Sequence, residues 1–198
     1  MPAISAGAGK LRSVVTYLEM TARPDLPAAV PPREGGAIVP VSHPSVPFYR
    51  YLFAVIGEPW MWMERRKMSD GDLAALIHDP GIDIAILYVD GEPGGYFELD
   101  ARNPAEIELV YCGVVPWLIG KGWGSFLIRS AIGRAWSHNP RRMWLHTCDL
   151  DHPGAIAFYE RQGFVKYDEQ VEVFDDPRLT GLLPRIAGPH IPIADRSS

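Results

Sequence analysis

The chain has 198 residues, of which 47% are hydrophobic and 22% charged, and this composition is typical of a globular protein with one sizeable core. Its net charge of -5 argues against nucleic acid as a partner, because binding to a phosphate backbone requires a basic surface. Cys112 and Cys148 form no paired or metal-like motif, and no apolar run is long enough to span a membrane. We therefore expect a single cytoplasmic domain over residues 1–198, with no membrane partner.

The N-terminal part of the sequence predicts one strand, one long loop and two helices. Residues 1–47 combine a strand at 12–20, rich in β-branched and aromatic side chains, with a proline-rich loop that has no sustained periodicity. Apolar residues recur at helical spacing over 48–56, and a second, short helix can be capped by Ser69 or Asp70.

The regular part of the sequence follows over residues 84–174. Two apolar runs around Asp90-Gly91 predict a hairpin, and residues 106–115 predict a third long strand. The remaining predicted elements are, in chain order, a helix over 127–136, a strand over 143–148, a helix over 153–162 that Gly163 ends, and a strand over 164–174. Residues 178–198 show no clear period and predict an irregular, loosely held tail.

A strand, a turn of alternating glycines and an amphipathic helix meet at Gly120-Lys121-Gly122-Trp123-Gly124. Such a turn can bind an anion, because the first N–H groups of a helix lack intrahelical partners and glycines let a phosphate approach the backbone. The alternative is a tight connection in which the glycines only supply unusual backbone angles. The spacing fits neither a Walker loop nor the dinucleotide fingerprint, which would need glycine at the position of Leu127.

Together with Val114-Val115-Pro116, this turn resembles the cofactor motif of the GNAT superfamily of N-acetyltransferases. A second segment, Ala155 to Phe164, is similar to the superfamily's downstream signature, in which an alanine and a tyrosine one helical turn apart precede a Gly-Phe pair. The resemblance covers roughly residues 84–174. It implies an α/β fold with a mixed, centrally splayed β-sheet, helices on both faces and coenzyme A at the splay.

The resemblance also implies that acetyl-CoA is the cosubstrate and that the residues of these motifs bind it. They are Val114, Val115, Gly120, Lys121, Gly122, Trp123, Gly124, Ser125 and His152. Two positions depart from the family's pattern, since Ile119 stands where Arg or Gln is usual and His152 stands where Asn is usual. Backbone N–H groups can bind the phosphates without the first side chain, whereas His152 could belong to the helix start or to the substrate mouth.

Acetyl transfer to an amine requires a base for the nucleophile and an acid for the departing thiolate. Tyr159 matches the superfamily's usual general acid, although such a residue can also be an aromatic that only packs at a helix start. Glu108, four residues before Cys112, resembles the catalytic glutamate of the superfamily's histone acetyltransferases and is the leading candidate base. Glu106 and Glu98 are alternative bases, and all three carboxylates could instead be solvated strand residues.

Aromatic and cationic residues cluster just after the first predicted helix, at Trp60, Trp62, Arg65 and Arg66. In the superfamily, that helix and the following segment wall the acceptor pocket. Aromatic walls with a cation would suit an acceptor that has an apolar part and an acidic group, with core packing as the alternative for at least one tryptophan.

No metal site is predicted. His146, Cys148 and His152 match no zinc spacing. Cys112 and Cys148 are expected in the core, because no cysteine nucleophile is needed if the amine attacks directly.

Two functions therefore remain open at this point. The first is an N-acetyltransferase that moves an acetyl group from acetyl-CoA to a primary amine by direct attack in a ternary complex. The second is a non-catalytic acyl-CoA-binding or sensing module on the same scaffold. The acceptor can be a small-molecule amine or a protein amine, and a homodimer is an open option.

Overall fold

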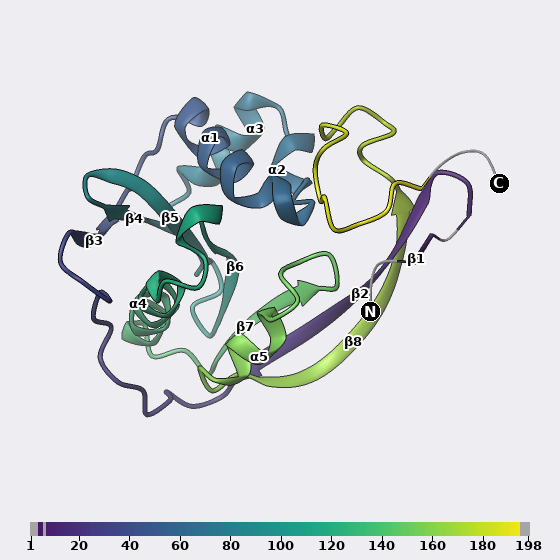
Figure 1. The fold of residues 1–198 in the computed structure, drawn as a ribbon. Coiled ribbons are helices and arrows are strands. Elements are labelled where there is room, and N and C mark those ends of the chain that lie inside the picture. Colours follow the sequence, from purple (N-terminus) through teal and green to yellow (C-terminus); the bar gives the residue numbers. More distant parts are fainter. Residues whose placement is uncertain (1–3, 6, 195–198) are drawn as a thin grey trace.

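The computed structural model describes residues 4–5 and 7–194, and Figure 1 shows the arrangement of its elements. The strands are β1 (Ile4–Ser5), β2 (Lys10–Met20), β3 (Gly36–Pro40), β4 (Ile82–Val89), β5 (Glu92–Asp100), β6 (Glu106–Val114), β7 (Arg142–Cys148) and β8 (Val165–Asp175). The helices are α1 (Val46–Gly57), α2 (Glu64–Lys67), α3 (Asp70–Ile77), α4 (Trp123–Ser137) and α5 (Ala155–Glu160), with short 3-10 turns η1 (Glu58–Trp60) and η2 (Pro116–Leu118). Within the described residues, no helix is long and apolar enough to cross a bilayer.

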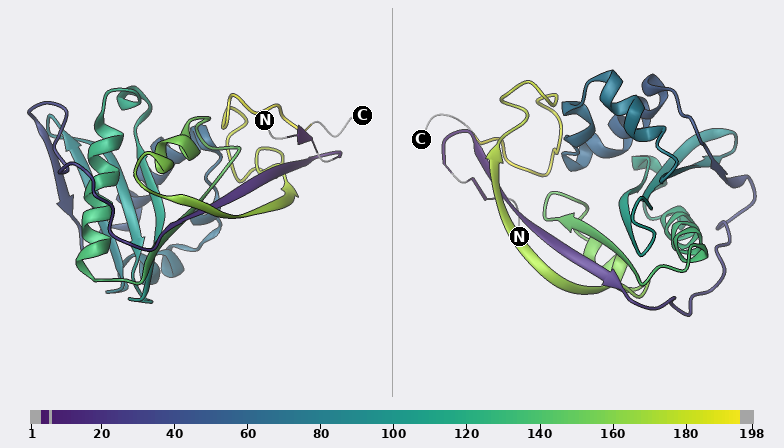
Figure 2. Two further views of the ribbon diagram at one scale, coloured as in Figure 1. Left: turned by 90° about the horizontal axis from the view of Figure 1, so that it is seen from below. Right: turned by 180° about the vertical axis from the view of Figure 1, so that it is seen from behind.

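The strands form one mixed sheet in the order β1-β2-β7-β6-β5-β4-β3. All neighbouring strands are antiparallel except β6 and β7, which run parallel and pair only from Glu106 with Arg142 to Glu108 with Trp144. Beyond these three pairs the two strands diverge, and α1 and α4 lie on opposite faces of the sheet (Figures 1 and 2). The predicted α/β fold, with a mixed and centrally splayed sheet and helices on both faces, is confirmed.

The N-terminal strand β2 lies in the second half of the sheet, between β7 and β8. It is antiparallel to both, with Val15–Met20 facing β7 and Lys10–Glu19 facing β8. The long curved pair of β2 and β8 is visible in both views of Figure 2. The strand predicted at 12–20 is thus confirmed, and its position joins the two ends of the chain within one sheet.

The prediction of an uninterrupted loop over 21–47 is wrong, because β3 forms within this segment. Residues Gly36–Pro40 pair with Ala85–Val89 of β4 at the outer edge of the sheet. The strand is only five residues long and mostly exposed, so it carries neither the alternation nor the length that would predict a strand. Its pairing partner lies about fifty residues further along the chain, and that contact is not encoded locally.

The predicted helices begin and end close to their predicted bounds, whereas the four-residue α2 was not predicted. Ser69 caps α3, where its hydroxyl accepts a hydrogen bond of 3.1 Å from the backbone N–H of Asp72. The left-handed Gly163, with φ of 92°, ends the turn after α5 as predicted. The apolar face predicted over 127–136 lies within α4, which starts at Trp123, directly behind the glycine turn.

The tail has no helix or strand over residues 176–194, as predicted, but it is firmly packed rather than loosely held. The Arg178 guanidinium donates to both carboxylate oxygens of Asp176 and to the backbone oxygens of Ala187, Ile191 and Pro192. The side chains of Arg178 and Asp176 are 1% and 0% exposed, and this ion pair holds the pKa of Asp176 below its usual value although burial alone would raise it. Residues 195–198 lie outside the described residues.

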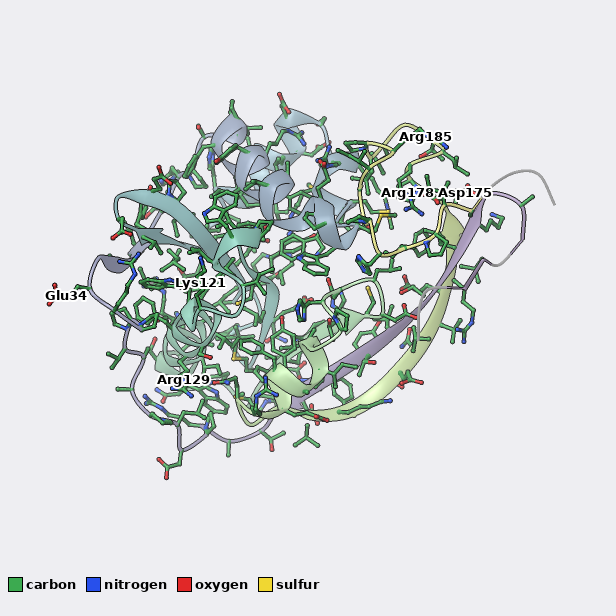
Figure 3. The ribbon with its side chains drawn as sticks, viewed as in Figure 1. Glu34, Lys121, Arg129, Asp175, Arg178 and Arg185 are labelled. Atoms are coloured by element: carbon green, nitrogen blue, oxygen red, sulfur yellow. The ribbon has the colours of Figure 1, made fainter. Side chains whose placement is uncertain are left out.

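The ion pair of Asp176 and Arg178 holds the tail over a second, smaller core. The buried apolar residues of this core come from the tail, from β2 and from the segments after η1 and β7; they are Leu11, Met61, Leu150, Leu183, Ala187, Ile191 and Ala194. Gly188 also donates its N–H to the Glu58 carbonyl at 3.1 Å. The tail is therefore part of the folded domain, and Figure 3 shows Arg178 at the base of its loop.

We predict that Asp176→Asn lowers the free energy of unfolding by about 3 kcal/mol or more, because it leaves a buried guanidinium without its counter-charge. Chemical denaturation measures the loss, and hydrogen exchange locates it in residues 176–194. Asp175→Asn is the matched control, because the neighbouring Asp175 side chain is 67% exposed and forms a surface ion pair with Lys10. If Asp176→Asn were as stable as Asp175→Asn, the result would contradict this role for the ion pair.

Candidate active site

A cavity of about 750 Å³ opens where β6 and β7 part. One group of lining residues comes from the end of β6, the glycine turn and α5, and includes Val114, Gly120, Gly122, Gly124, Ser125, Phe158 and Tyr159. A second group comes from β2, β7, β8 and the segment after α1, and includes Tyr17, Trp62, Glu64, His146, Asp151 and Glu172. We call the first group the turn side and the second group the β2 side of the cavity.

The turn side is built on two glycines with left-handed backbone angles. Gly120 has φ of 76° and Gly122, the N-cap of α4, has φ of 85°, values that residues with a Cβ rarely adopt. Within the described part of the chain, the N–H groups of Gly120, Gly122 and Gly124 have no hydrogen-bond partner. Three free donors at the positive end of a fifteen-residue helix make this wall suited to an anion.

Three residues of the predicted coenzyme motif do not line the cavity. Val115 is fully buried and donates its N–H to the Gly94 carbonyl at 2.9 Å. Trp123 is 2% exposed and packs in the core, with Arg33 over its ring at 5.5 Å. Lys121 lies at a separate surface hollow beside Arg33, and its position on the turn is labelled in Figure 3. The glycines of the predicted motif thus line the cavity, whereas Val115, Lys121 and Trp123 lie outside its wall.

Tyr159 lines the cavity from α5 and packs against Phe158 and Phe164. Burial raises the pKa of its phenol well above the usual value, and the nearby Cys112 and Asp151 raise it further. Tyr159 consequently keeps its proton across the physiological pH range, which is the state that a general acid requires.

The three candidate carboxylates differ sharply in their surroundings. Glu98 is fully buried on β5, where it accepts hydrogen bonds from Tyr49 and Arg65, so it is already neutralised inside the core. Glu106 lies on the paired stretch of β6 and contacts Arg142 at 3.4 Å. Neither of these two lines the cavity.

Glu108 sits at the point where β6 and β7 part, but its side chain does not line the cavity either. Its Oε1 lies 3.4 Å from Nδ1 of His146, and His146 does line the cavity. In the sequence, His146 stands out only as a possible metal ligand and not as a partner of Glu108. The signal that could have found it is the register of two parallel strands, which places Trp144 beside Glu108 and cannot be known from the sequence alone.

The segment after α1 does border the cavity, but with its aromatic residues rather than its arginines. Trp62 lines the cavity, stacks near Tyr111 with centroids 4.9 Å apart, and donates its indole N–H to Asp151 at 3.2 Å. Arg65 and Arg66 instead form ion pairs with Glu98 and Glu58 at 2.5 and 2.7 Å and do not line the cavity. Arg65 and Arg66 are therefore not available in the cavity wall for an acidic acceptor group, and the arginine that does line the cavity is Arg161, directly after α5 on the turn side.

Asp151 is a further residue that the sequence analysis missed. Its second carboxylate oxygen accepts hydrogen bonds from the Thr147 hydroxyl at 2.6 Å and from the Cys148 N–H at 3.1 Å. It thus ties the turn after β7 to Trp62 across the cavity.

His152 lies in the turn before α5, as its position in the motif predicts. Its Nδ1 accepts a hydrogen bond of 3.0 Å from the Gly154 N–H, so it organises the start of that helix. Its ring packs edge-on against Trp60, and Trp60 also contacts His190 of the tail. His152 therefore borders the cavity at its mouth. Within residues 4–5 and 7–194, no three His, Cys, Asp or Glu side chains cluster in a way that could hold a metal ion.

Comparison with known proteins identifies the family. The model of the acetyltransferase (GNAT) family matches residues 43–164, which include the glycine turn and Tyr159. The chain belongs to this family. A curated relative from Lactobacillus delbrueckii subsp. lactis, described as an uncharacterized N-acetyltransferase in the pepI 3′ region, is 30% identical over 127 residues; they make up 60% of this chain and 72% of the relative.

Solved structures of GNAT proteins share the fold at lower sequence identity. A GCN5-related N-acetyltransferase from Sphaerobacter thermophilus has a TM-score of 0.61 and 16% identity, covering 85% of this chain and 53% of that one. One from Kribbella flavida has a TM-score of 0.54 and 18% identity, covering 87% of this chain and 63% of that one. The chain thus spans between about half and two thirds of these structures. Membership of the GNAT family supports acyl transfer as the general activity.

We predict that both thiols of this GNAT chain react slowly in the folded state, because burial raises the pKa of Cys112 and of Cys148 to about 12. At pH 8 only about one thiol in ten thousand would then be a thiolate, against about a quarter of an unperturbed cysteine. Labelling with dithionitrobenzoate measures the rates, and the chain unfolded in guanidinium, where both thiols should react at once, is the control. Rapid labelling of the folded protein would contradict the buried environment of these residues.

Proposed function

We propose that this chain transfers the acetyl group of acetyl-CoA to a primary amine by direct attack in a ternary complex. The observation that carries the proposal is that one cavity is lined both by the free N–H groups of the glycine turn and by the protonated hydroxyl of Tyr159. The first can bind the diphosphate of the donor, and the second can protonate its leaving thiolate.

The glycine turn fits the coenzyme in both charge and shape. The donors of Gly120, Gly122 and Gly124 would bind the pyrophosphate, with Ser125 beside them on the cavity wall. The pantetheine arm would then run along the unpaired end of β6, where Val114 lines the cavity. A backbone N–H in this stretch would polarise the thioester carbonyl.

The reaction proceeds by simple substitution at the thioester carbon. The amine nitrogen bonds to the carbonyl carbon, the carbon–sulfur bond breaks, and the electron pair of that bond leaves on the sulfur. Tyr159 gives its proton to the thiolate, while the amine loses one proton to a base at the diverging ends of β6 and β7. Glu108 is the carboxylate that stands at this point.

The β2 side of the cavity favours an acceptor with positive charge. Glu64, Asp151 and Glu172 line it, and within the described residues Glu172 forms no ion pair. Trp62 and Tyr111 supply aromatic surface next to these acids. Since Arg65 and Arg66 are engaged elsewhere, we propose a cationic amine with an apolar part in place of an acceptor with an acidic group.

The alternative is a module that binds acyl-CoA without turnover, and product analysis separates the two. Acetyl-CoA is incubated with tyramine, spermidine, kanamycin or a lysine-containing peptide, and both free CoA and acetylated amine are followed by mass. The proposal predicts that CoA and acetylated product appear in equal amounts with at least one amine. Binding of acetyl-CoA without CoA release for every amine would contradict it.

We predict that Tyr159→Phe lowers kcat by about a hundredfold or more, because the thiolate then leaves without its proton donor. The affinity for acetyl-CoA should change little, since the ring and its packing against Phe158 and Phe164 remain. Steady-state kinetics and calorimetry measure the two quantities. Tyr51→Phe is the control, because Tyr51 is 52% exposed on α1 and lies outside the cavity. Full turnover by the Tyr159 variant would exclude it as the acid.

We predict that Glu172→Gln raises KM for a cationic acceptor by about fivefold at low salt, since one charge pair near water is worth about 1 kcal/mol. The effect should fade as salt is added. Glu169→Gln is the control on the same strand, because Glu169 pairs with Lys166 and lies off the cavity. Equal KM values for both variants at low salt would contradict an acidic acceptor site.

A further inference from the structure

The Glu108 carboxylate and the cavity are separated by another side chain, the imidazole of His146. His146 lines the cavity and is 46% exposed, whereas Glu108 is 21% exposed and lies off the cavity. Their closest atoms, Nδ1 and Oε1, are 3.4 Å apart. The pair forms because Glu108 is the last residue of β6 that pairs with β7, and His146 follows two residues beyond its partner Trp144, on the same face.

We propose that His146 is the group that takes the proton of the acceptor amine, and that Glu108 acts through it as a positioning residue. The proposal rests on the acetyl transfer proposed above and identifies the base of that same site. When the amine nitrogen bonds to the thioester carbon, one N–H proton passes to Nε2 of His146. The electron pair of the breaking carbon–sulfur bond leaves on the sulfur, which Tyr159 protonates.

A carboxylate beside Nδ1 suits this role. It favours the tautomer that carries its proton on Nδ1, and this leaves the lone pair of Nε2 free to accept a proton. It also stabilises the imidazolium that forms when Nε2 is protonated. Glu108 therefore assists without touching the substrate.

Two aromatic side chains lie beside the ring of His146. Tyr17, its partner in the ladder between β2 and β7, lies 5.8 Å away between centroids, and Trp144 lies 6.4 Å away. These contacts restrict rotation of the imidazole, so that its orientation does not depend on the carboxylate alone.

The charged and titratable groups around His146 come from every strand that packs against it. They are Glu108 on β6, Tyr17 on β2, Glu172 on β8 and Asp151 in the turn after β7. The adjacent Glu108 carboxylate raises the pKa of His146 above its usual value of 6.5, partly offset by burial, and Asp151 and Glu172 add to the rise. Turnover should therefore increase with pH as the imidazole loses its proton, with a midpoint above 6.5.

His152 also lines the cavity, but it is a poorer base. Its Nδ1 already accepts a hydrogen bond from the Gly154 N–H, so in the neutral ring the proton sits on Nε2. A nitrogen that carries a proton cannot accept another one. Among the histidines of the described cavity wall, His146 alone thus has a nitrogen free to act.

The test is the pH dependence of kcat, followed by CoA release with acetyl-CoA and the panel amine that is acetylated fastest. His146→Gln should lose the rising limb of the profile and about a hundredfold or more of the plateau rate. Glu108→Gln should keep the limb but move it to lower pH, because the imidazole loses its adjacent negative charge. Added imidazole should restore part of the rate of His146→Gly. Glu106→Gln, on the same strand but off the cavity, is the matched control.

A rising limb that persists unchanged in His146→Gln would overturn the role of His146, and a limb that Glu108→Gln does not move would overturn the role of Glu108. NMR titration of the His146 ring in the wild type and in Glu108→Gln tests their coupling without turnover, and an unchanged titration overturns it as well. If the wild type releases no CoA with any amine, the proposed acetyl transfer itself fails and takes the base role with it. These failures are distinguishable because only the last one appears in the unmodified protein.

Discussion

The early end of pairing between the parallel strands β6 and β7 is the constraint on which the rest of the site depends. Only three residue pairs join them, up to Glu108 and Trp144, yet β6 continues to Val114 and β7 to Cys148. Beyond these pairs, the facing edges of β6 and β7 are not paired with each other, and this gap lies in the middle of the sheet rather than at its outer edge. An extended ligand can enter such a gap and hydrogen-bond to the strand backbone, as an added peptide strand does at a sheet edge.

The two walls of this gap are assembled in different ways. Most of the turn side is continuous in the sequence, since β6, the short η2 and the glycine turn at the start of α4 follow one another, and α5 joins them from further along the chain. The β2 side gathers residues from both ends of the chain, because β2 lies between β7 and β8 and brings Tyr17 close to His146 and Glu172. The buried ion pair of Asp176 and Arg178 then holds the tail against β2 and η1, so the acceptor mouth depends on long-range packing.

This difference explains how much of the molecule could be predicted from its sequence. Long periodic segments, the glycine turn and Tyr159 are local patterns, and the structure places all of them as expected, with Tyr159 on the cavity. The predictions that were wrong concern residues whose partners lie far along the chain. Strand β3 pairs with β4, about fifty residues further along the chain. The Arg65 guanidinium binds Glu98, thirty-three residues later, and therefore does not line the cavity.

The candidate base shows the same limit at the level of one side chain. The spacing to Cys112 predicts Glu108 as a base, but that spacing does not reveal which side chain lies between the carboxylate and the cavity. The register of β6 and β7 puts His146 in that place. In the same way, Val115 and Trp123 match the motif and yet face the core, because alternate residues of a strand end and of a helix start point in different directions.

We propose that the gap between β6 and β7, together with the glycine turn, forms the binding site for the acyl donor. A crystal structure of the chain with coenzyme A tests it most directly. We expect pyrophosphate oxygens within hydrogen-bond distance of the N–H groups of Gly120, Gly122 and Gly124, and a pantetheine arm that passes Val114 toward Tyr159. A coenzyme bound with its pyrophosphate away from this turn, or with its thiol outside the gap between the two strands, would contradict it.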